Sequence, residues 1–551
     1  MDVIAESKTR VLQGRDERRN QTIPSQSPEE RDRLVHAFHP DYKKEEYHRI
    51  RIGPNAGERT VREVAELLES DSSLPDNLDL TPQYRVDVLV VGGGGAGATA
   101  ALTAKAQGAE VLLVTKLRLG DSNTVMAQGG MQVAITENDS PVTHFFDTLR
   151  GGHHKNDPKL LKVLVEEGPM AAQWLIQLGV LFDRDENGNL KTKKGGGSTQ
   201  PRLLTCSDYT GLEIMRVLKD EVLNRQIPVL EFSPVVELLS DADGTCTGAV
   251  LKNMDNGQLI VVAAQSVILA TGGSGRLHIE GFPTSNHYGA TGDALVLAYR
   301  LGARLSHMDT FQYHPTGSVY PEQLAGALVT EGIRSDGGHL VNQDGRRFIN
   351  ELDTRDVVAA AIIRECAEGR GVKTPAGRVG VWLDVPMIDL LIGEGSIAKR
   401  FPAMVRQFQR YGMDIREEPV LVYPTLHYQN GGVAIDVDGQ SQVKGLFVAG
   451  EASGGLHGRN RLMGNSLLDL IVFGKRAGVA AAQRAKEARV RKLTLTHVTR
   501  FRGELEKNNI KPARVAPIIL PDYVRREEAP PPRPSRSLIN QTPYRISPRS
   551  D

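Results

Sequence analysis

Short apolar runs bounded by glycine alternate with stretches of helical spacing through most of this chain. The clearest unit covers residues 86–116, where an apolar, β-branched run at 86–91 leads into a glycine-rich turn, small residues at 98–107 and a second apolar run ending at Val114. This order predicts strand, turn, helix and strand in one continuous unit. Such a βαβ unit is typical of an α/β protein with a parallel sheet.

The turn in this unit has the spacing G-x-G-x-x-G, formed by Gly92, Gly94 and Gly97. The first glycine permits a tight turn, the second lets a pyrophosphate approach the backbone, and the third allows close packing of helix and strand. An ordinary glycine-rich turn is the alternative, but the flanking strand and helix favour a dinucleotide site with phosphates at the helix N-terminus. The second strand ends in Thr115 and Lys116, where an NAD site would have an acid, so NAD is the weaker prediction.

Further elements are indicated beyond this unit. We predict helices over residues 61–68, 157–178 and 466–481, and strands over 229–239, 248–262, 266–270 and 445–450. Residues 127–130 form a second glycine turn, and the strand at 266–270 runs directly into Thr271-Gly272-Gly273. Two strand-to-glycine turns indicate that the dinucleotide is held from both ends.

The order of these elements predicts a nucleotide-binding domain in two pieces, residues 83–308 and 426–487, interrupted by an α+β capping insert over 309–425. Residues 1–82 form a polar extension, and we expect its first thirty residues to be disordered. The aromatic residues Phe38, Tyr42 and Tyr47 could anchor it on the body or on a partner. Residues 488–551, with prolines at 530–532 and 534, are expected to form a Pro-rich wrapping tail.

Length and composition narrow the class of protein. A chain of 551 residues exceeds one ordinary core, and its 67 basic residues equal its 67 acidic ones, so nothing draws it to nucleic acid or a membrane surface. The three cysteines, far apart and without a C-x-x-C pair, suit a reducing compartment and cannot alone ligate an iron–sulfur cluster. With no secretory signal or membrane-spanning run, we expect a soluble, cytoplasmic protein that could reach a membrane through partners, and we predict no metal site.

A second group of residues mixes cations, neutral donors and one acid. These residues are His314, Thr330, Glu331, Arg334, Arg355, His427 and Arg461. Arginine presents a planar fork that matches a carboxylate, and an imidazole can donate beside it. Any one of them is more often an ordinary core or surface residue, but together, beside a redox nucleotide, they indicate an anionic substrate.

Ten collinear motifs between residues 86 and 481 carry a family resemblance. They are VVGGGGAG, NTVMAQGG, ILATGG, GATGDALVLAYRLGA, FQYHPTG, LVTEGIRSDGG, RDVV, PTLHYQNGG, LFVAGEA and GRNRLMGNSLLDLIVFG. The chain resembles the flavoprotein subunit of succinate dehydrogenase and fumarate reductase, and the related L-aspartate oxidases. The resemblance implies FAD as the cofactor in a Rossmann-like domain, and it accounts for Thr115-Lys116, because this family typically has Ser/Thr-Lys there.

The resemblance also implies roles for individual residues. Arg355 would donate a proton to the substrate carbon opposite hydride delivery by flavin N5, with Glu331 and Arg334 relaying protons to it. One carboxylate of a C4-dicarboxylate such as fumarate or succinate would be held by His427 and Arg461, and the other by His314 and Thr330. FAD would be contacted by Gly92, Gly94, Gly95, Ala96, Gly97, Thr115, Lys116, Asn123, Thr124, Gln128, Gly129, Gly130, Ala270, Thr271, Gly272, Asp293, Glu451, Asn465, Ser466 and Leu467.

Three departures from the family pattern change the expectations. Asn123 stands where succinate dehydrogenases usually have the histidine that is covalently joined to FAD, so non-covalent FAD is expected. Lys194 stands near the position of a glutamate that faces the substrate amine in aspartate oxidases, which counts against L-aspartate without excluding it. The long helical C-terminal domain of the relatives is missing, so electrons are expected to pass through a separate protein, most plausibly an iron–sulfur subunit. The alternatives are a stand-alone L-aspartate oxidase and a non-catalytic FAD-binding scaffold.

Overall fold

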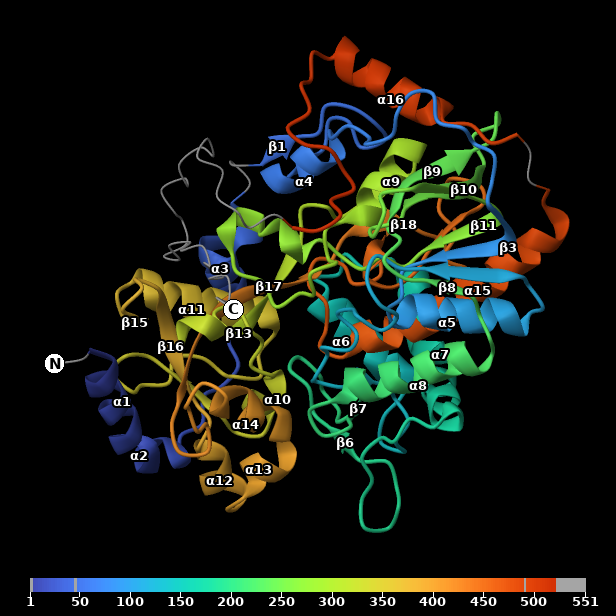
Figure 1. Cartoon of the computed structure of the whole chain (residues 1–551). Helices are drawn as coiled ribbons and strands as arrows, with labels where there is room; N and C mark the ends of the chain where they lie inside the picture. Colours follow the sequence, from blue (N-terminus) through green and yellow to red (C-terminus); the bar gives the residue numbers. More distant parts are fainter. Residues whose placement is uncertain (1–2, 44–46, 490–491, 522–551) are drawn as a thin grey trace, which may run out of the picture.

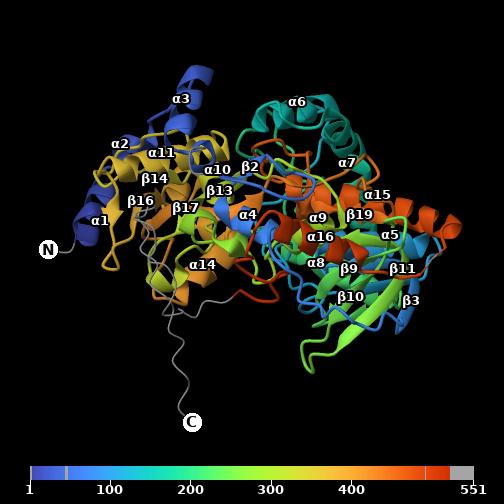
Figure 2. The same ribbon diagram turned by 90° about the horizontal axis from the view of Figure 1, so that it is seen from above.

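The computed structural model describes residues 3–43, 47–489 and 492–521. Two lobes lie side by side in Figure 1 and, viewed from above, in Figure 2. We call them the nucleotide lobe, which contains β3 (Tyr84–Val91), and the cap lobe, which contains β13 (Phe311–Ser318). The combination of mainly parallel and purely antiparallel sheets confirms the α/β fold with an α+β insert.

The nucleotide lobe is built on a seven-stranded sheet in the order β8-β4-β3-β11-β10-β9, with β19 also pairing with β11. Its other strands are β4 (Val111–Val114), β8 (Val229–Leu230), β9 (Val235–Ser240), β10 (Cys246–Lys252), β11 (Leu259–Leu269) and β19 (Leu446–Val448). β8, β4, β3, β11 and β19 pair in parallel, whereas β10 pairs antiparallel with both β9 and β11. The parallel part places several carboxyl ends at one edge, where α/β proteins bind ligands.

Helices cover this sheet on both sides (Figure 1). α5 (Gly95–Ala106) and α15 (Asn465–Glu487) pack closely, because a Cβ on Gly478 would meet Ala100 O at 2.6 Å. Outside them lie α6 (Pro141–Gly151), α7 (Pro158–Leu178) and α8 (Thr210–Asn224). The other side carries α4 (Arg62–Leu68), α9 (Asp293–Leu301) and α16 (Thr496–Lys507).

The cap lobe contains a five-stranded antiparallel sheet in the order β13-β17-β16-β14, with β15 pairing with β16. The strands are β14 (His339–Val341), β15 (Val372–Lys373), β16 (Val379–Asp384) and β17 (Val420–Gln429). Its helices are α10 (Glu331–Ser335), α11 (Arg355–Ala367), α12 (Met387–Ile392), α13 (Ser396–Arg400) and α14 (Pro402–Gln409). β17 crosses the expected domain boundary at 425/426, so one strand belongs to the cap sheet and ends beside the nucleotide lobe.

Short strands complete the structure. They are β1 (His48–Arg49), β2 (Arg59–Thr60), β5 (Met131–Gln132), β6 (Thr192–Lys193), β7 (Leu203–Leu204), β12 (Leu305–Ser306), β18 (Gly432–Ala434) and β20 (Ser453–Gly454). The helices predicted over 61–68, 157–178 and 466–481 are confirmed as α4, α7 and α15. The single strand predicted over 248–262 is wrong, because Asn253 N donates to Gln258 O at 2.9 Å and the chain turns between β10 and β11.

The first thirty residues are not disordered in this structure, contrary to our expectation. α1 (Val3–Gln13), α2 (Arg15–Arg19) and α3 (Pro28–Phe38) lie on the outside of the cap lobe (Figures 1 and 2). Arg15 and Arg18 pair with Asp384 at 2.7 and 2.6 Å, and the Asp384 side chain has no exposed surface. The polar residues that suggested disorder therefore include two arginines that pair with a buried carboxylate of the cap lobe, Asp384.

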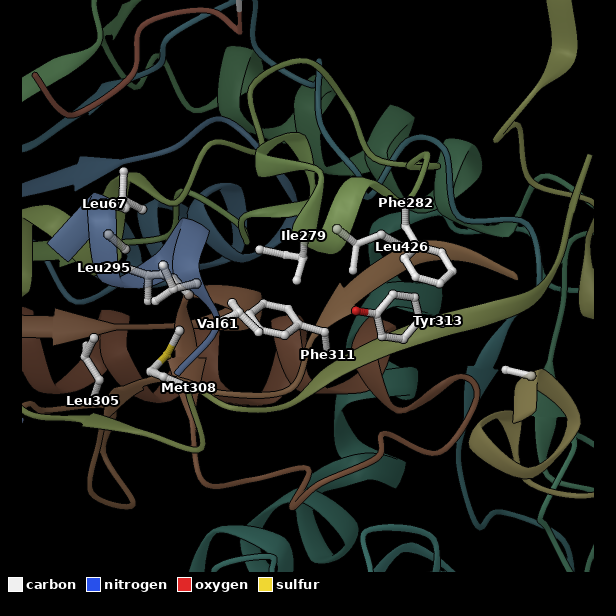
Figure 3. Packing of buried hydrophobic residues seen from close by; sticks show 14 of the residues in the cluster. Val61, Leu67, Ile279, Phe282, Leu295, Leu305, Met308, Phe311, Tyr313 and Leu426 are labelled. Carbon is white, nitrogen blue, oxygen red and sulfur yellow. The ribbon is translucent and has the colours of Figure 1, made fainter. Parts of the chain in front are cut away.

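A continuous apolar cluster joins the extension to both lobes. Figure 3 shows Val61 and Leu67 at or on α4, Leu295 on α9, and Phe311 and Tyr313 on β13 packed together. The expected aromatic anchor contacts the body of the protein: Phe38 and Tyr42 pack against this cluster, and Tyr47 donates its hydroxyl to Asp309 O at 3.0 Å. The extension is therefore part of the core.

The C-terminal region is only partly as expected. Residues 496–507 form α16, which packs on α9, whereas the prolines at 530–532 and 534 lie outside the described residues. Cys206, Cys246 and Cys366 are free and buried. Over residues 3–43, 47–489 and 492–521, no helix is long and apolar enough to cross a membrane, and no cluster of acidic, histidine or cysteine side chains is suited to a metal ion.

Candidate functional site

A cavity of about 560 Å³ opens at the carboxyl ends of β3, β4 and β11. Most of the residues predicted to hold the cofactor line it. They are Gly92, Gly94, Gly95, Ala96, Thr115, Lys116, Asn123, Thr124, Gln128, Ala270, Thr271, Gly272, Asp293, Glu451, Ser466 and Leu467. The cavity thus collects side chains and turns from segments that are as much as several hundred residues apart.

The glycines form the cradle by close backbone approach. Gly92 has φ +123°, and a Cβ there would stand 2.2 Å from Ala270 O. A Cβ on Gly97 would stand 1.8 Å from Gly92 O, so the helix can begin against the turn only without a side chain. This is the packing role expected of the third glycine in a dinucleotide fingerprint.

Four predicted cofactor residues are not in the lining and support it from behind. Gly97 lets α5 approach the turn, while Gly129 and Gly130 approach Met463 and Leu204. Asn465 holds the start of α15, because its Oδ1 lies 2.8 Å from His144 Nε2 and its Nδ2 donates to Thr148 Oγ1 at 2.9 Å. Burial lowers the pKa of His144 to about 4, so this imidazole is neutral.

Polar groups stand at both ends of the cavity. At one end, Lys116 pairs with Asp293 at 2.7 Å. At the other, Asn123 Nδ2 donates to Glu451 Oε2 at 3.1 Å, and burial raises the pKa of Glu451. The buried Gln128 Oε1 has no hydrogen-bond partner among the described residues, which suits a ligand that brings its own N–H donor.

The sequence did not single out several other lining residues. Among them are Ser122, Met126, Ser233, Arg276, Asn286 and His287. Asn286 and His287 reach the site because they bond to Asn123, at 3.2 Å to Asn286 Oδ1 and 2.7 Å from His287 N. Only the neighbourhood of the NTVMAQGG motif could have pointed to Ser122 and Met126.

The residues predicted to move protons, together with His314, converge on one carboxylate, that of Glu331. Its Oε2 lies 2.7 Å from Arg355 Nε, 3.2 Å from Arg334 Nη2 and 3.9 Å from His314 Nε2. Its Oε1 accepts from Gly196 N at 3.1 Å. Glu331 and Arg334 lie one turn apart on α10, as expected, and Arg355 begins α11. The structure therefore brings the three residues expected to move protons into direct contact.

The charges in this group follow from burial and from each other. Burial alone would raise the pKa of Glu331, but Arg355 and Arg334 outweigh it and lower that pKa, so the group is a carboxylate. Burial lowers the pKa of Arg334 and of Arg461. Arg461 Nε is buried without a hydrogen-bond partner among the described residues. A cation with an unused donor is suited to an anion from solution.

The two histidines of this group are neutral. Burial, with the neighbouring arginines, lowers the pKa of His314 and of His427 well below the usual value, and their rings lie 5.1 Å apart. His314 Nδ1 accepts from Thr316 N at 3.2 Å, which leaves its Nε2 to carry the proton and face Glu331. His427 Nδ1 lies 2.8 Å from Ser285 Oγ. Both imidazoles can thus donate one hydrogen bond without adding charge.

Gln312, which sequence reasoning missed, connects the cations. Its Oε1 accepts from Arg355 Nη1 at 2.8 Å and from Arg461 Nη2 at 2.9 Å. Its Nε2 donates to Asn460 Oδ1 at 2.8 Å. Gln312 lies two residues before His314 on β13, so the motif FQYHPTG carried the signal, and it holds two guanidinium groups in a fixed relation.

The remaining predictions differ in outcome. Thr330 is buried, and its hydroxyl caps α10 by accepting from Gly332 N at 3.4 Å, which leaves its proton to donate. His427 and Arg461 also line the cavity, so the charged group opens directly to it. Lys194 does not stand beside the site as we expected, because its side chain is exposed and outside the cavity lining. From that loop, Gly196 makes the contact to Glu331.

Known proteins are similar to this chain in sequence. A family model described as an FAD binding domain matches residues 87–467. The chain is 41% identical over 445 residues to a fumarate reductase (CoM/CoB) subunit of Methanothermobacter marburgensis, covering 78% of this chain and 79% of that one. It is 39% identical over 414 residues to an L-aspartate oxidase of Streptomyces coelicolor, covering 72% and 69%.

The fold is similarly shared. FrdA of the E. coli quinol fumarate reductase superposes with a TM-score of 0.70 at 32% identity, covering 77% of this chain and 74% of that chain. The span matched by the family model, residues 87–467, includes both the turns that form the cavity and the arginines and histidines beside it.

Proposed function

The chain belongs to the family of flavoproteins with this FAD-binding domain, and we propose that it is the catalytic subunit of a complex that interconverts fumarate and succinate. It is an FAD-dependent oxidoreductase. The observation that carries the choice of substrate is the convergence of Arg334, Arg355 and Arg461 with two neutral imidazoles beside the cavity.

The residues present fit FAD. Gly92 and Gly97 let the turn and the start of α5 pack without a clash, Gly94 lines the cavity where a pyrophosphate would approach the backbone, and the buried Gln128 Oε1 is free to accept a hydrogen bond from the cofactor. Lys116 and Asp293 would hold the adenosine end, and Asn123, Glu451 and Ser466 would hold the flavin half. Bound FAD supplies the two-electron chemistry of the reaction.

The side chains of the charged group bind and orient the dicarboxylate. Arg461 and His427 line the cavity and would hold one carboxylate, with the free Nε of Arg461 as the unused donor. His314 and Thr330 would hold the other through donors that carry no charge. The Arg461 cation with a neutral imidazole on one side, and two neutral donors on the other, would place the carbon–carbon bond between fixed points, and the cation would stabilise charge that develops on the substrate.

Arg355 would then donate the proton. Its Nε is bound to Glu331 and its Nη1 to Gln312, whereas Nη2 has no hydrogen-bond partner among the described residues. Glu331 contacts both Arg355 and Arg334, so a proton lost by Arg355 can be replaced from Arg334 through the carboxylate. A guanidinium is ordinarily a very weak acid, and this direct replacement of its proton is what would make it usable as a proton donor.

Electrons would pass to or from a separate protein. The relatives include components of larger complexes, such as FrdA of the quinol fumarate reductase. The three cysteines of this chain are buried singly, so an iron–sulfur cluster would have to lie in the partner. We propose a cytoplasmic protein that reaches a membrane only through such partners.

The cofactor would be non-covalent. Asn123 occupies the position of the tethering histidine, and its amide is engaged by Glu451 and His287 N. Acid precipitation of the purified protein should leave the flavin in the supernatant. A yellow, fluorescent pellet would contradict this proposal.

The function is tested by assaying purified protein with reduced viologen and fumarate, and by oxidising succinate and L-aspartate with an artificial acceptor. The proposal predicts that fumarate has the largest kcat/KM. L-aspartate oxidation is the second candidate because a relative of 39% identity is an L-aspartate oxidase and Lys194 no longer argues against it. Efficient L-aspartate oxidation without fumarate reduction would favour the oxidase, and flavin binding without any turnover would favour the scaffold.

A further inference from the structure

After α16 the chain returns to the nucleotide lobe along residues 510–521. This segment forms a parallel bridge with the N-terminal extension, because Asp71 N donates to Arg514 O at 3.2 Å and Ala516 N donates to Asp71 O at 3.0 Å. Arg514 also pairs with Glu66 of α4 at 2.9 Å. The C-terminal segment is therefore tied to the last part of the N-terminal extension.

Arg300 fixes this junction from within. Its side chain is about 1% exposed and pairs with Glu237 of β9 at 2.9 Å. Its Nη2 donates to Asp71 O at 2.7 Å and to Ala516 O at 2.8 Å. One buried guanidinium thus joins the sheet, the N-terminal extension and the C-terminal segment, and the attachment of residues 514–516 has a specific, fully buried anchor.

Two residues further on, the segment reaches the cofactor cavity. The carbonyl of Ile518 accepts from Lys116 Nζ at 2.9 Å and from Thr291 Oγ1 at 3.0 Å. Lys116 Nζ also donates to Thr291 Oγ1 at 2.7 Å and pairs with Asp293 at 2.7 Å. Lys116 and Asp293 line the cavity, whereas Ile518 lies behind them. The Ile518 carbonyl therefore does not face the cavity, but it holds Lys116, which does.

The position of Lys116 identifies which part of the cofactor is affected. It lies two residues after the end of β4, the second strand of the βαβ unit, and this is where such a unit binds the ribose next to the adenine. The flavin half would lie at the opposite end, toward Asn123, Glu451 and Ser466. A change behind Lys116 should therefore weaken the binding of the adenylate half of FAD and leave the binding of the flavin half unchanged.

We propose that residues 514–518 form a clasp that holds Lys116 and the 289–293 loop in place, and so retains the adenylate half of FAD. A lysine side chain has many rotamers in solution, and here its ammonium is fixed by three partners, one of which the clasp supplies. Without Ile518 O, Lys116 loses one acceptor, the wall gains freedom, and water reaches the adenosine end. If FAD is bound without a covalent link, as proposed above, contacts such as these must keep it in the protein.

The clasp is tested by comparing two truncated proteins. One ends at Pro512 and lacks the clasp, whereas the matched control ends at Pro521 and keeps every described residue. Equilibrium binding to the apoproteins is measured for FAD, for ADP-ribose and for FMN. We expect the protein ending at Pro512 to bind FAD and ADP-ribose about tenfold more weakly, to release FAD faster, and to bind FMN as the full chain does. The control should match the full chain with all three ligands.

Other outcomes overturn the proposal. An equal loss of affinity for FMN and FAD would mean that the segment only stabilises the fold, and unchanged affinity for FAD would mean that Lys116 holds its place unaided. Should the protein ending at Pro512 not fold, full-length Thr291→Val replaces it, with Thr291→Ser as the rescue variant. Thr291→Val removes the hydroxyl through which Ile518 O is joined to Lys116 and Asp293. Thr291→Val must then weaken the binding of ADP-ribose and of FAD but not the binding of FMN. Thr291→Ser must restore the affinity for ADP-ribose and for FAD. Because all readouts are binding, failure of the fumarate reductase proposal would leave this test unaffected.

Discussion

The cofactor cavity and the charged group beside it are built on opposite principles. The shape of the cavity depends on close backbone approach at glycine, as where Gly97 behind the lining meets Gly92 O, and its charged side chains, such as Lys116 and Glu451, stand at its ends. The charged group is made of buried ionised side chains that leave little space and satisfy one another around Glu331. The cavity depends on positions that have no side chain, and the charged group depends on ion pairs between side chains. Substitutions should therefore damage them differently.

The largest effect is expected in the charged group from Arg355→Gln. Turnover with fumarate should fall roughly 10² to 10⁴-fold, because the variant keeps hydrogen-bonding capacity but cannot supply the proton. FAD content should stay unchanged, since Arg355 is not in the cavity lining. Arg355→Lys is the matched control, since it keeps a cation but not the fork that binds Glu331 and Gln312. Turnover near the wild-type value in Arg355→Gln would contradict the role of Arg355 as proton donor.

Beside the cavity, Gly97→Ala should have the opposite effect: weaker FAD binding with little change in turnover per bound flavin. The added Cβ would stand 1.8 Å from Gly92 O, so the turn must move, at a cost of about 1–3 kcal/mol. FAD affinity, measured by flavin fluorescence, should fall by about tenfold to a hundredfold, while turnover per bound flavin changes little. Gly503→Ala on α16, where a Cβ would meet nothing within 4 Å, is the control. A loss of turnover per flavin without a loss of affinity would break the contrast between the regions.

A smaller effect, on stability, comes from His144 behind the cavity. Its pKa is lowered by burial to about 4 in the folded protein, against about 6.5 when unfolded. The unfolded chain therefore binds more protons between these values, and the free energy of unfolding should drop as pH falls from about 6.5 to 4, by up to about 3 kcal/mol. His144→Gln should flatten the pH dependence of urea denaturation in that window. An unchanged slope would show that His144 is not buried as a neutral group.

The smallest effect, on KM, is expected at Gln312. Gln312→Glu adds one negative charge where Arg355 and Arg461 meet, so it should compete with the dicarboxylate and raise the KM for fumarate about tenfold. Gln312→Leu removes the bridge without adding charge and should raise the KM less. If the two variants behave alike, the amide acts by packing and not by its contacts with the arginines.

The sequence predicted the cavity better than the charged group for a physical reason. A glycine fingerprint is local: Gly92, Gly94 and Gly97 can be recognised within six residues because the turn they form is itself local. Gln312 was missed because an amide on a strand becomes a bridge only when Arg461, on a distant segment, packs against it. The contact between Glu331 and Arg355 had to come from a family resemblance, because no spacing encodes it.

Errors in the fold have similar causes. The turn between β10 and β11 was overlooked because apolar residues continue on both sides of it, although Asp255-Asn256-Gly257 is a recognisable turn signal. The helices in the first thirty residues could not be predicted from composition, since the acid that pairs with Arg15 and Arg18 is Asp384 of the cap lobe. Lys194 was placed in the site by a loose alignment of a glycine-rich loop, and its exposure corrects that placement.

Arg300 also has a consequence for the order of events on the ribosome. Glu237 is synthesised before it, but the carbonyl of Ala516 follows 216 residues later, which is roughly 10 to 40 s at common rates of translation. During that interval the complete glycine turn already exists, while one acceptor of the buried guanidinium does not. The glycine turn is therefore synthesised well before the segment that completes the wall beside Lys116, and a chain that ends before Ala516 would carry the turn without the finished wall.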